Sequence, residues 1–290
     1  MAASSYPPST VLGRQLGGEL RTLREQKGFS TADVAAALEC TKGKVSRIEN
    51  GRVPLRNPDL VAMLRMYGAD ESTSERLGSL ARTANRRRRT GWWNEYGTLL
   101  ADTYRDFIAM EAEASLVRTF QSQTVPALLQ TAEYAQALAV ASRWWKHPEE
   151  IEQFVAVRIK RQLRLTSEEP LQVWAVIAEG ALRQHVGGPH VMRAQLEHIT
   201  HWAQQEHVTV QVVPFRTGAH ASMGGPYVLL SFPDDGSLDV ALLDNPSGSI
   251  WLEKAEDVAV YRTLWDDVRT SALSPADSVQ LINSIKEHLQ

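Results

Sequence analysis

Two short helical patterns, separated by a turn of only a few residues, constrain the fold of this chain more than any other feature of its sequence. Ser30 is a suitable N-cap for the first pattern, residues 31–38, whose apolar positions share one face. Thr41 is a suitable N-cap for the second pattern, in which Val45 and Ile48 point inward. Short helices joined by a turn of about three or four residues form a helix-turn-helix, which is therefore the predicted motif.

Helical patterns on both sides of this motif complete a small module. Before it, a leucine at every third or fourth position predicts a helix that ends near Gly28; these leucines are Leu12, Leu16, Leu20 and Leu23. After it, Asn57 and Pro58 begin a fourth helix, with proline at its first position, and a fifth helix spans residues 71–89. We expect residues 11–89 to form an all-helical domain of five helices, preceded by a disordered tail over residues 1–10.

The charge of the chain is divided unevenly between this module and the rest. Residues 11–90 contain 16 lysines and arginines against 9 acidic residues, whereas residues 91–290 contain 15 against 25. The first part therefore carries a net charge of +7 and the second −10, although the whole chain carries only −3. Such asymmetry indicates a basic nucleic-acid-binding module joined to an acidic module with another task.

The helix-turn-helix stretch, residues 31–51, resembles the Cro/repressor-type (XRE) family of transcriptional regulators. The closing Ser-Arg-Ile-Glu-x-Gly of that family appears as residues 46–51, and Ala35 stands where the family places a small residue between its two helices. The resemblance implies a lambda-repressor-like fold that binds double-stranded DNA. It also implies an ion pair between the first and third helices, at Arg24 and Glu49.

Two positions depart from the pattern of that family. Glu39 occupies the turn, where glycine is usual because the backbone there is left-handed. A side chain in this conformation costs about 1 kcal/mol, which a domain of this kind can tolerate. Thr31 stands where many relatives carry a glutamine that braces the contact to DNA. We therefore expect weaker direct readout of the bases by the second helix of the motif, which is the third helix of the module.

The third helix is expected to enter the major groove, where its exposed side chains read the bases. Because Val45 and Ile48 face the core, the exposed positions are Lys42, Gly43, Lys44, Ser46 and Arg47. Lys44 and Arg47 can donate to guanine O6 and N7, whereas Ser46 suits a phosphate or a base. Gly43 lets the helix lie close to the groove floor. Residues at helix starts and in the following loop suit phosphate contacts: Thr31, Thr41, Asn50 and Arg52, with Arg56 a weaker candidate.

Two aromatic and basic segments near residue 90 each have two interpretations. The run of four arginines at residues 86–89 either follows the DNA backbone or forms a solvated helix end, which is the commoner role of a charge run. Trp92 and Trp93 could stack on bases, but adjacent residues on a helix point about 100° apart, so packing of one ring in a core is favoured.

Residues 90–290 combine helical and strand patterns in separate runs, which is typical of an α+β domain. Helices are expected over residues 101–121, 127–142, 148–164, 189–204, 255–271 and 275–289. Strands of one sheet are expected over residues 171–177, 208–215, 227–232, 239–243 and 249–253. These segments are short, rich in β-branched or aromatic residues, and bounded by Gly, Pro or Asp.

The beginning of this second domain is similar to an uncharacterised domain of actinobacterial regulators. The similarity rests on the Gly-Trp-Trp from Gly91 and on the Val-Pro-x-Leu-Leu-Gln-Thr-x-x-Tyr-Ala at residues 125–135. Such domains follow an XRE-type helix-turn-helix, are described as antitoxin-like, and are often encoded beside a small partner protein. The resemblance therefore implies that the acidic domain binds a small neighbouring-gene protein. Sensing of a small molecule in a pocket, or dimerisation alone, are the alternatives.

The sequence offers little support for a metal, a cofactor or catalysis. A single cysteine, Cys40, excludes an intramolecular disulfide and a multi-cysteine zinc site. His198 and His201 have a spacing that metal ligands use, but they lie at the edge of the apolar helix face and opposite to it. The glycine-rich segment 218–226 lacks the features of a phosphate-binding loop or a nucleophile elbow. The acidic pairs at 234–235 and 266–267 suit turns and solvated helix faces. Because none of these candidates combines a nucleophile, a base and an orienting residue, we expect that the protein is not an enzyme.

These patterns together predict a sequence-specific DNA-binding transcriptional regulator. The protein is expected to be a homodimer, because one helix-turn-helix reads few base pairs and dimers bind two half-sites about 34–36 Å apart. No apolar run approaches the roughly 20 residues that span a bilayer, and residues 1–10 do not have the composition of a signal peptide. We therefore expect a cytoplasmic protein without a membrane partner.

Overall fold

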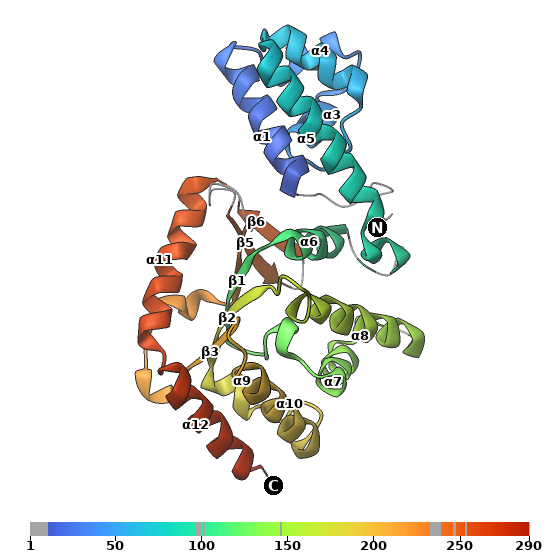
Figure 1. The fold of residues 1–290 in the computed structure, drawn as a ribbon. Helices are drawn as coiled ribbons and strands as arrows, with labels where there is room; N and C mark the ends of the chain where they lie inside the picture. The colour runs from blue at the N-terminus through green and yellow to red at the C-terminus, as the bar shows by residue number, and fades with distance from the viewer. Residues whose placement is uncertain are drawn as a thin grey trace. The chain divides into compact units, whose positions relative to one another are not determined.

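The structure is a computed structural model that describes residues 11–96, 100, 102–145, 147–232, 239–245, 248–252 and 254–289. The chain divides into two compact units, residues 1–113 and 114–290 (Figure 1). The described part of the first unit is helical, and the second unit contains a six-stranded sheet with helices. The predicted fold class, a helical DNA-binding domain followed by an α+β domain, is confirmed. The tail expected over residues 1–10 lies outside the described residues.

The helices of the first unit begin and end close to the predicted positions. They are α1 (Val11–Gln26), α2 (Thr31–Ala37), α3 (Lys42–Glu49), α4 (Asn57–Tyr67) and α5 (Glu71–Thr90), followed by a 3-10 turn (Trp92–Tyr96) and α6 (Asp102–Glu113). Both predicted caps are present: Ser30 Oγ accepts a hydrogen bond from the Asp33 amide, and Thr41 Oγ1 accepts one from the Lys44 amide. One core of this unit joins α1 to α5 through apolar side chains that include Leu20, Val34, Val45, Leu60 and Leu77.

Glycines allow α1 to cross the end of α3 at backbone contact. A Cβ atom at Gly17 would lie 2.4 Å from the Glu49 carbonyl oxygen, and one at Gly51 would lie 2.6 Å from the Arg14 amide nitrogen. Gly51 also has a φ of +63°, which favours glycine. Glu39, in the turn between α2 and α3, has a φ of +49°, so the turn is left-handed without glycine, as predicted.

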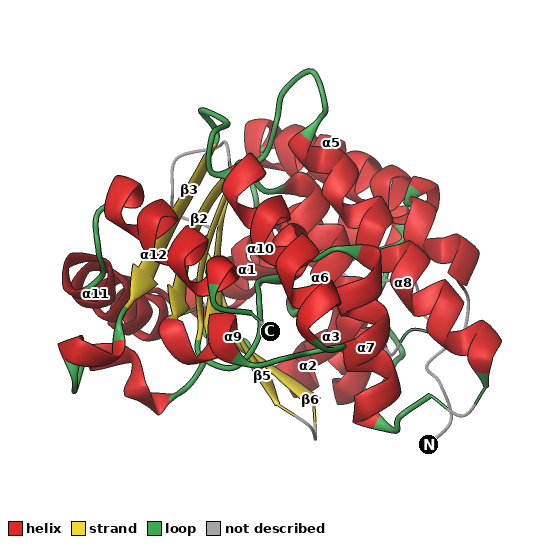
Figure 2. Ribbon diagram, turned by 90° about the horizontal axis from the view of Figure 1, so that it is seen from below, coloured by secondary structure: helices red, strands yellow, loops and turns green. Residues whose placement is uncertain are grey.

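The sheet of the second unit is mixed, with strand order β3-β2-β1-β4-β5-β6. Its strands are drawn in yellow in Figure 2. The strands are β1 (Leu116–Gln121), β2 (Gln172–Ala178), β3 (Val208–Val213), β4 (Tyr227–Ser231), β5 (Val240–Asn245) and β6 (Gly248–Leu252). Neighbours among β1, β2 and β3 run parallel, whereas β4 is antiparallel to β1, and β5 and β6 continue antiparallel. The five strands predicted from residue 171 onward are all present in this one sheet.

Helices connect the parallel strands and cover the sheet. Between β1 and β2 lie α7 (Ala132–Ser142) and α8 (Pro148–Gln162), and between β2 and β3 lie α9 (Glu179–Arg183) and α10 (Pro189–Trp202). The chain continues after β6 with α11 (Ala255–Ser271) and α12 (Pro275–Glu287). Figure 1 shows α11 on the opposite side of the sheet from α7 and α8. Trp265 and Val268 of α11 pack there against Phe120, Val176 and Leu229.

The predicted helix over residues 101–121 is wrong in its second half. The helix α6 ends at Glu113, and Leu116–Gln121 forms β1 in the middle of the sheet. β1 is hydrogen-bonded to β2 on one side and to β4 on the other, both far away in sequence. Pairing on both edges outweighs the helical period of a short segment, since strand preference depends mainly on neighbours.

The predicted helix over residues 127–142 is interrupted, and the interruption explains the motif at residues 125–135. Gln130 is extended, with φ −86° and ψ 142°, and Thr131 caps α7. Gln130 Nε2 donates to the Val125 carbonyl at 2.7 Å, and Tyr134 accepts from the Val125 amide at 3.1 Å. Gln195 of α10 accepts from the Thr131 amide at 2.8 Å. Gln130 and Tyr134 of the motif therefore form hydrogen bonds with the backbone of a buried turn.

Candidate nucleic-acid interface

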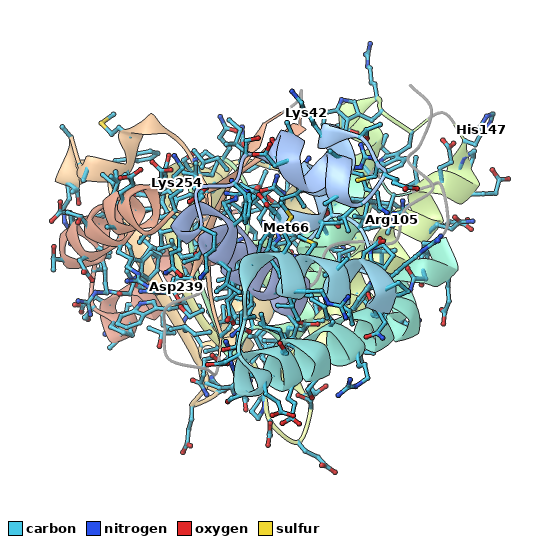
Figure 3. All side chains as sticks on the ribbon, turned by 90° about the horizontal axis from the view of Figure 1, so that it is seen from above. Lys42, Met66, Arg105, His147, Asp239 and Lys254 are labelled. Carbon is cyan, nitrogen blue, oxygen red and sulfur yellow. The ribbon has the colours of Figure 1, made fainter. Side chains whose placement is uncertain are left out.

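The outer face of α3 carries the predicted recognition residues. Val45 and Ile48 are buried, whereas Lys42, Ser46 and Arg47 are exposed. Lys42 is labelled in Figure 3. Gly43 is exposed as well, and a Cβ atom there would meet only the Arg47 guanidinium and the Thr41 hydroxyl, at 3.5 and 3.8 Å. No backbone therefore obstructs this part of the helix, and the side chains beside it are those of Lys42, Arg47 and Thr41.

Lys44 is held by a partner that sequence reasoning missed. Its Nζ lies 2.8 Å from Oδ2 of Asp59, in the first turn of α4, and the lysine side chain is 36% exposed. The aspartate neutralises the lysine charge in the free protein. Lys44 can reach a base or a phosphate only by exchanging this partner for DNA, so its role differs from that of the freely exposed Lys42.

A second network orients Ser46 and Asn50 at the end of α3. Arg21 of α1 donates through Nη2 to Asn50 Oδ1 at 2.6 Å, and Asn50 Nδ2 lies 3.4 Å from Ser46 Oγ. Arg21 Nε also lies 3.4 Å from the Glu49 carboxylate. Asn50, predicted as a phosphate contact, therefore has a positioning role in the free protein. The spacing of Arg21 and Arg24, one turn apart on α1, is the signal that could have identified Arg21.

Arg24 and Glu49 form the ion pair between the first and third helices. Arg24 Nε lies 2.7 Å from Glu49 Oε1, and Nη2 lies 3.1 Å from Oε2, in a bidentate arrangement. The side chains are 9% and 2% exposed. Hydrogen bonding to Glu49 raises the pKa of Arg24, while burial opposes it. Arg24 also donates to the Phe29 carbonyl at 2.8 Å, so one guanidinium joins α1, the loop before α2 and α3.

The remaining predicted contacts lie around α3. Thr31 is half-buried at the start of α2, whereas Thr41, Arg52 and Arg56 are exposed. The side chains of residues 86–89 lie outside the described residues, so the two interpretations of the arginine run stay open. Trp93 is buried and Trp92 half-buried, and their rings pack edge to face at 5.9 Å.

Two of the other site candidates, His198 and Ser222, have structural partners, whereas the acidic pair at residues 234–235 lies outside the described residues. His198 Nε2 lies 3.0 Å from Trp202 Nε1, and burial, followed by the charge of nearby His201, lowers the pKa of His198. Ser222 in the glycine-rich segment is buried against the Tyr227 hydroxyl at 2.9 Å. Within the described ranges, no three His, Cys, Asp or Glu side chains cluster as metal ligands do. None of the described helices has the length and apolar character needed to cross a bilayer.

Comparison with family models gives two matches that divide the chain in the same order as the motifs. Residues 15–77 match a helix-turn-helix domain, and residues 104–284 match a domain of unknown function, DUF5753. Neither a curated protein nor a solved structure matches the chain significantly. The first match includes α2, α3 and the residues predicted to contact DNA from Thr31 to Arg56, but not the arginine run at residues 86–89.

Proposed function

The chain belongs to the DUF5753 family, with a helix-turn-helix domain in front of that domain, and from this premise we propose that it is a sequence-specific, homodimeric transcriptional regulator. The observation that carries the proposal is the outer face of α3. This face presents Lys42, Ser46 and Arg47 to solvent, while the buried pair of Arg24 and Glu49 holds the helix in place. A helix fixed in this way can enter a major groove without losing its orientation.

The charge of the helical domain supports the assignment of double-stranded DNA as the ligand. The net charge of +7 over residues 11–90 favours a polyanion and predicts affinity that falls steeply with salt. A homodimer is proposed because two-fold pairing lets one short helix read two half-sites. Since the proposed ligand is DNA, we place the protein in the cytoplasm and assign it no catalytic activity.

For the acidic second domain we propose binding of a small partner protein, in an antitoxin-like role. The net charge of −10 over residues 91–290 supports a basic partner, because opposite charge steers encounter and disfavours wrong partners. Gln130 and Tyr134 of the motif at 125–135 form hydrogen bonds inside a buried turn, so we do not assign them to the contact with this partner. Small-molecule sensing is the alternative and would require a ligand to change operator affinity.

Selection of bound DNA from a random library by the purified full chain tests this function. We expect enrichment of a pseudo-palindrome whose half-sites lie about one helical turn apart. On that site, Arg47→Ala should lose about 1–3 kcal/mol and flatten the sequence preference, whereas Arg52→Ala should weaken all sequences alike. Failure to enrich any sequence would overturn sequence-specific binding, and enrichment of a single half-site would overturn the dimer.

A further inference from the structure

The outer face of α11, in the second unit, differs from an ordinary solvent-facing helix surface. Val258, Trp265 and Val268 of this helix are buried against the sheet. Figure 1 shows α11 at the left edge of the second unit, with the sheet on its other side. Val260, on the outer face, is 55% exposed. Valine loses side-chain freedom in a helix, and surface positions of a helix usually carry stronger helix formers.

Four exposed residues form one stripe along this outer face. Residues that follow one another by four, three and four positions share one side of a helix, and here they are Glu256, Val260, Thr263 and Asp267. The Thr263 hydroxyl donates to the Ala259 carbonyl at 3.1 Å, so its methyl group is the part that is available to another surface. The stripe therefore has an apolar centre and a carboxylate at each end.

The arginines of α11 do not neutralise this stripe, because they are directed to residues of the sheet side. Arg262 Nη2 lies 2.7 Å from Oδ2 of the buried Asp239. The Arg269 guanidinium lies over the ring of Trp174, 4.9 Å from its centre. Lys254, at the N-cap, lies 3.8 Å from the first carboxylate of the stripe, but both side chains are more than 70% exposed. Such an exposed pair contributes little, so the stripe keeps its acidic character.

We propose that this stripe is the surface that binds a helix of the small basic partner protein, so the inference rests on the function proposed for the acidic domain. Helices pack through rows of side chains spaced by three and four positions, which is the spacing of the stripe. An apolar row of the partner helix covers Val260 and Thr263. Lysines or arginines at the ends of that row face Glu256 and Asp267.

A second copy of the chain fits this stripe less well than a basic partner does. Residues 91–290 carry a net charge of −10, so a second copy brings another acidic unit toward the two carboxylates. A basic helix instead meets charges of opposite sign, which favours encounter and disfavours wrong partners.

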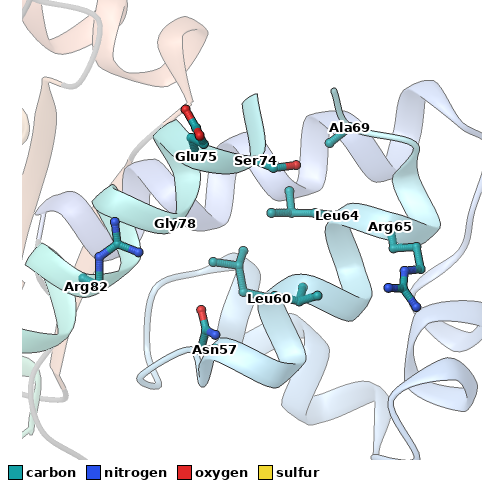
Figure 4. Close-up of a pocket in the computed structure, with 10 residues that line it drawn as sticks. Asn57, Leu60, Leu64, Arg65, Ala69, Ser74, Glu75, Gly78 and Arg82 are labelled. Atoms are coloured by element: carbon teal, nitrogen blue, oxygen red, sulfur yellow. The ribbon is translucent and has the colours of Figure 1, made fainter. Parts of the chain in front are cut away.

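A groove between α4 and α5 of the helical unit also fits a basic partner less well (Figure 4). Its volume is about 660 Å³, and Leu60 and Leu64 form an apolar part of its lining. Arg65 and Arg82 line the same groove, together with a single acidic residue, Glu75. Two arginines against one glutamate oppose a basic helix, so we place the partner on α11.

Titration calorimetry of the full chain with the small protein encoded next to it tests the proposal. Val260→Lys and Asp267→Lys each place a cation on the stripe, so each variant should bind this protein at least about tenfold more weakly than the wild type. The matched controls are Val140→Lys on α7 and Glu152→Lys on α8, at exposed positions on the other side of the sheet. Both controls should bind as the wild type does.

Val260→Ala separates an effect on binding from an effect on folding. Alanine favours a helix more than valine does, so the temperature of unfolding should be unchanged or higher. Loss of the valine methyl groups should nevertheless weaken partner binding about three- to tenfold. Circular dichroism during heating measures the first effect, and calorimetry measures the second.

Four outcomes would overturn the proposal, and they have different meanings. Wild-type affinity in both Val260→Lys and Asp267→Lys would place the partner elsewhere and leave the proposed function intact. Equal weakening by the two controls would show that net charge alone determines binding. Self-association of the wild type that Val260→Lys removes, measured by sedimentation equilibrium, would assign the stripe to a second copy. An absence of binding to the wild-type chain would contradict the proposed function of the domain itself.

Discussion

The contact between Lys44 and Asp59 determines what the recognition helix can offer to DNA. At 2.8 Å, the carboxylate holds the ammonium beside α4 and cancels its charge. A partly exposed pair of this kind contributes little to stability, so its effect on DNA binding can be separated from an effect on folding.

We predict that Asp59→Asn increases affinity for all DNA sequences and steepens the salt dependence by roughly one released counterion, because Lys44 then becomes available to a phosphate. Fluorescence anisotropy titrations at several salt concentrations measure both quantities. The control is Asp59→Asn with Lys44→Ala, which should lose the added affinity and the added slope. An unchanged slope in Asp59→Asn would show that Lys44 does not contact DNA.

Residue positions within one helix could be predicted from the sequence, whereas contacts between helices could not. Helical period separates buried Val45 and Ile48 from their exposed neighbours, because it depends only on local geometry. The partners of Lys44 and Asn50 lie 15 and 29 residues away, on α4 and α1. Such pairs depend on how helices pack, which no local pattern contains.

At the scale of elements, α3 is held to α1 by a buried ion pair and by backbone contact. Removing one partner of a buried pair leaves the other charge without compensation and can cost about 3–5 kcal/mol. We predict that Arg24→Met lowers the free energy of unfolding of the helical unit by an amount of this order. Arg24→Met combined with Glu49→Leu should recover much of the loss. Urea unfolding measured by circular dichroism tests this, and a double variant as unstable as the worse single variant would contradict a direct coupling.

Adjacent glycines on α1 provide a second test of the same contact. A Cβ at Gly17 would overlap the Glu49 and Ile48 carbonyls, whereas nothing lies within 4 Å of a Cβ at Gly18. Gly17→Ala should therefore destabilise the unit by about 1–3 kcal/mol, as overpacking does. Gly18→Ala should stabilise it by about 0.5–1 kcal/mol, because alanine favours the helix. Equal effects of the two changes on thermal unfolding would contradict the close crossing of α1 and α3.

The elements themselves were predictable where caps and periodicity agree, and not where tertiary pairing decides. Ser30, Thr41 and Pro58 mark helix starts that the structure contains. Residues 116–121 carry a helical pattern of apolar residues but form β1, since two distant strands supply its hydrogen bonds. Gln130 interrupts the predicted helix, because its side chain donates a hydrogen bond to the Val125 carbonyl. The apolar periodicity of residues 127–142 contains no sign of this contact.

At the scale of the whole molecule, the two halves of the chain have opposite charge. The net charge of −10 over residues 91–290 opposes the approach of a phosphate backbone. A basic partner bound to residues 91–290 reduces this repulsion, so partner binding and DNA binding are expected to be coupled. Because coupling free energy is reciprocal, DNA must change partner affinity by the same factor.

We therefore predict that residues 91–290, without the helix-turn-helix, retain a small basic protein encoded next to this chain, and that this protein changes the operator affinity of the full chain. Pull-down with the neighbouring protein as bait measures the first effect, and operator titrations with and without it measure the second. Salt should weaken partner binding, since opposite charges steer it. The isolated helix-turn-helix segment, residues 11–89, is the matched control and should bind DNA equally well with or without the partner. An absence of association, or association that leaves operator affinity unchanged, would favour small-molecule sensing or dimerisation as the task of the acidic domain.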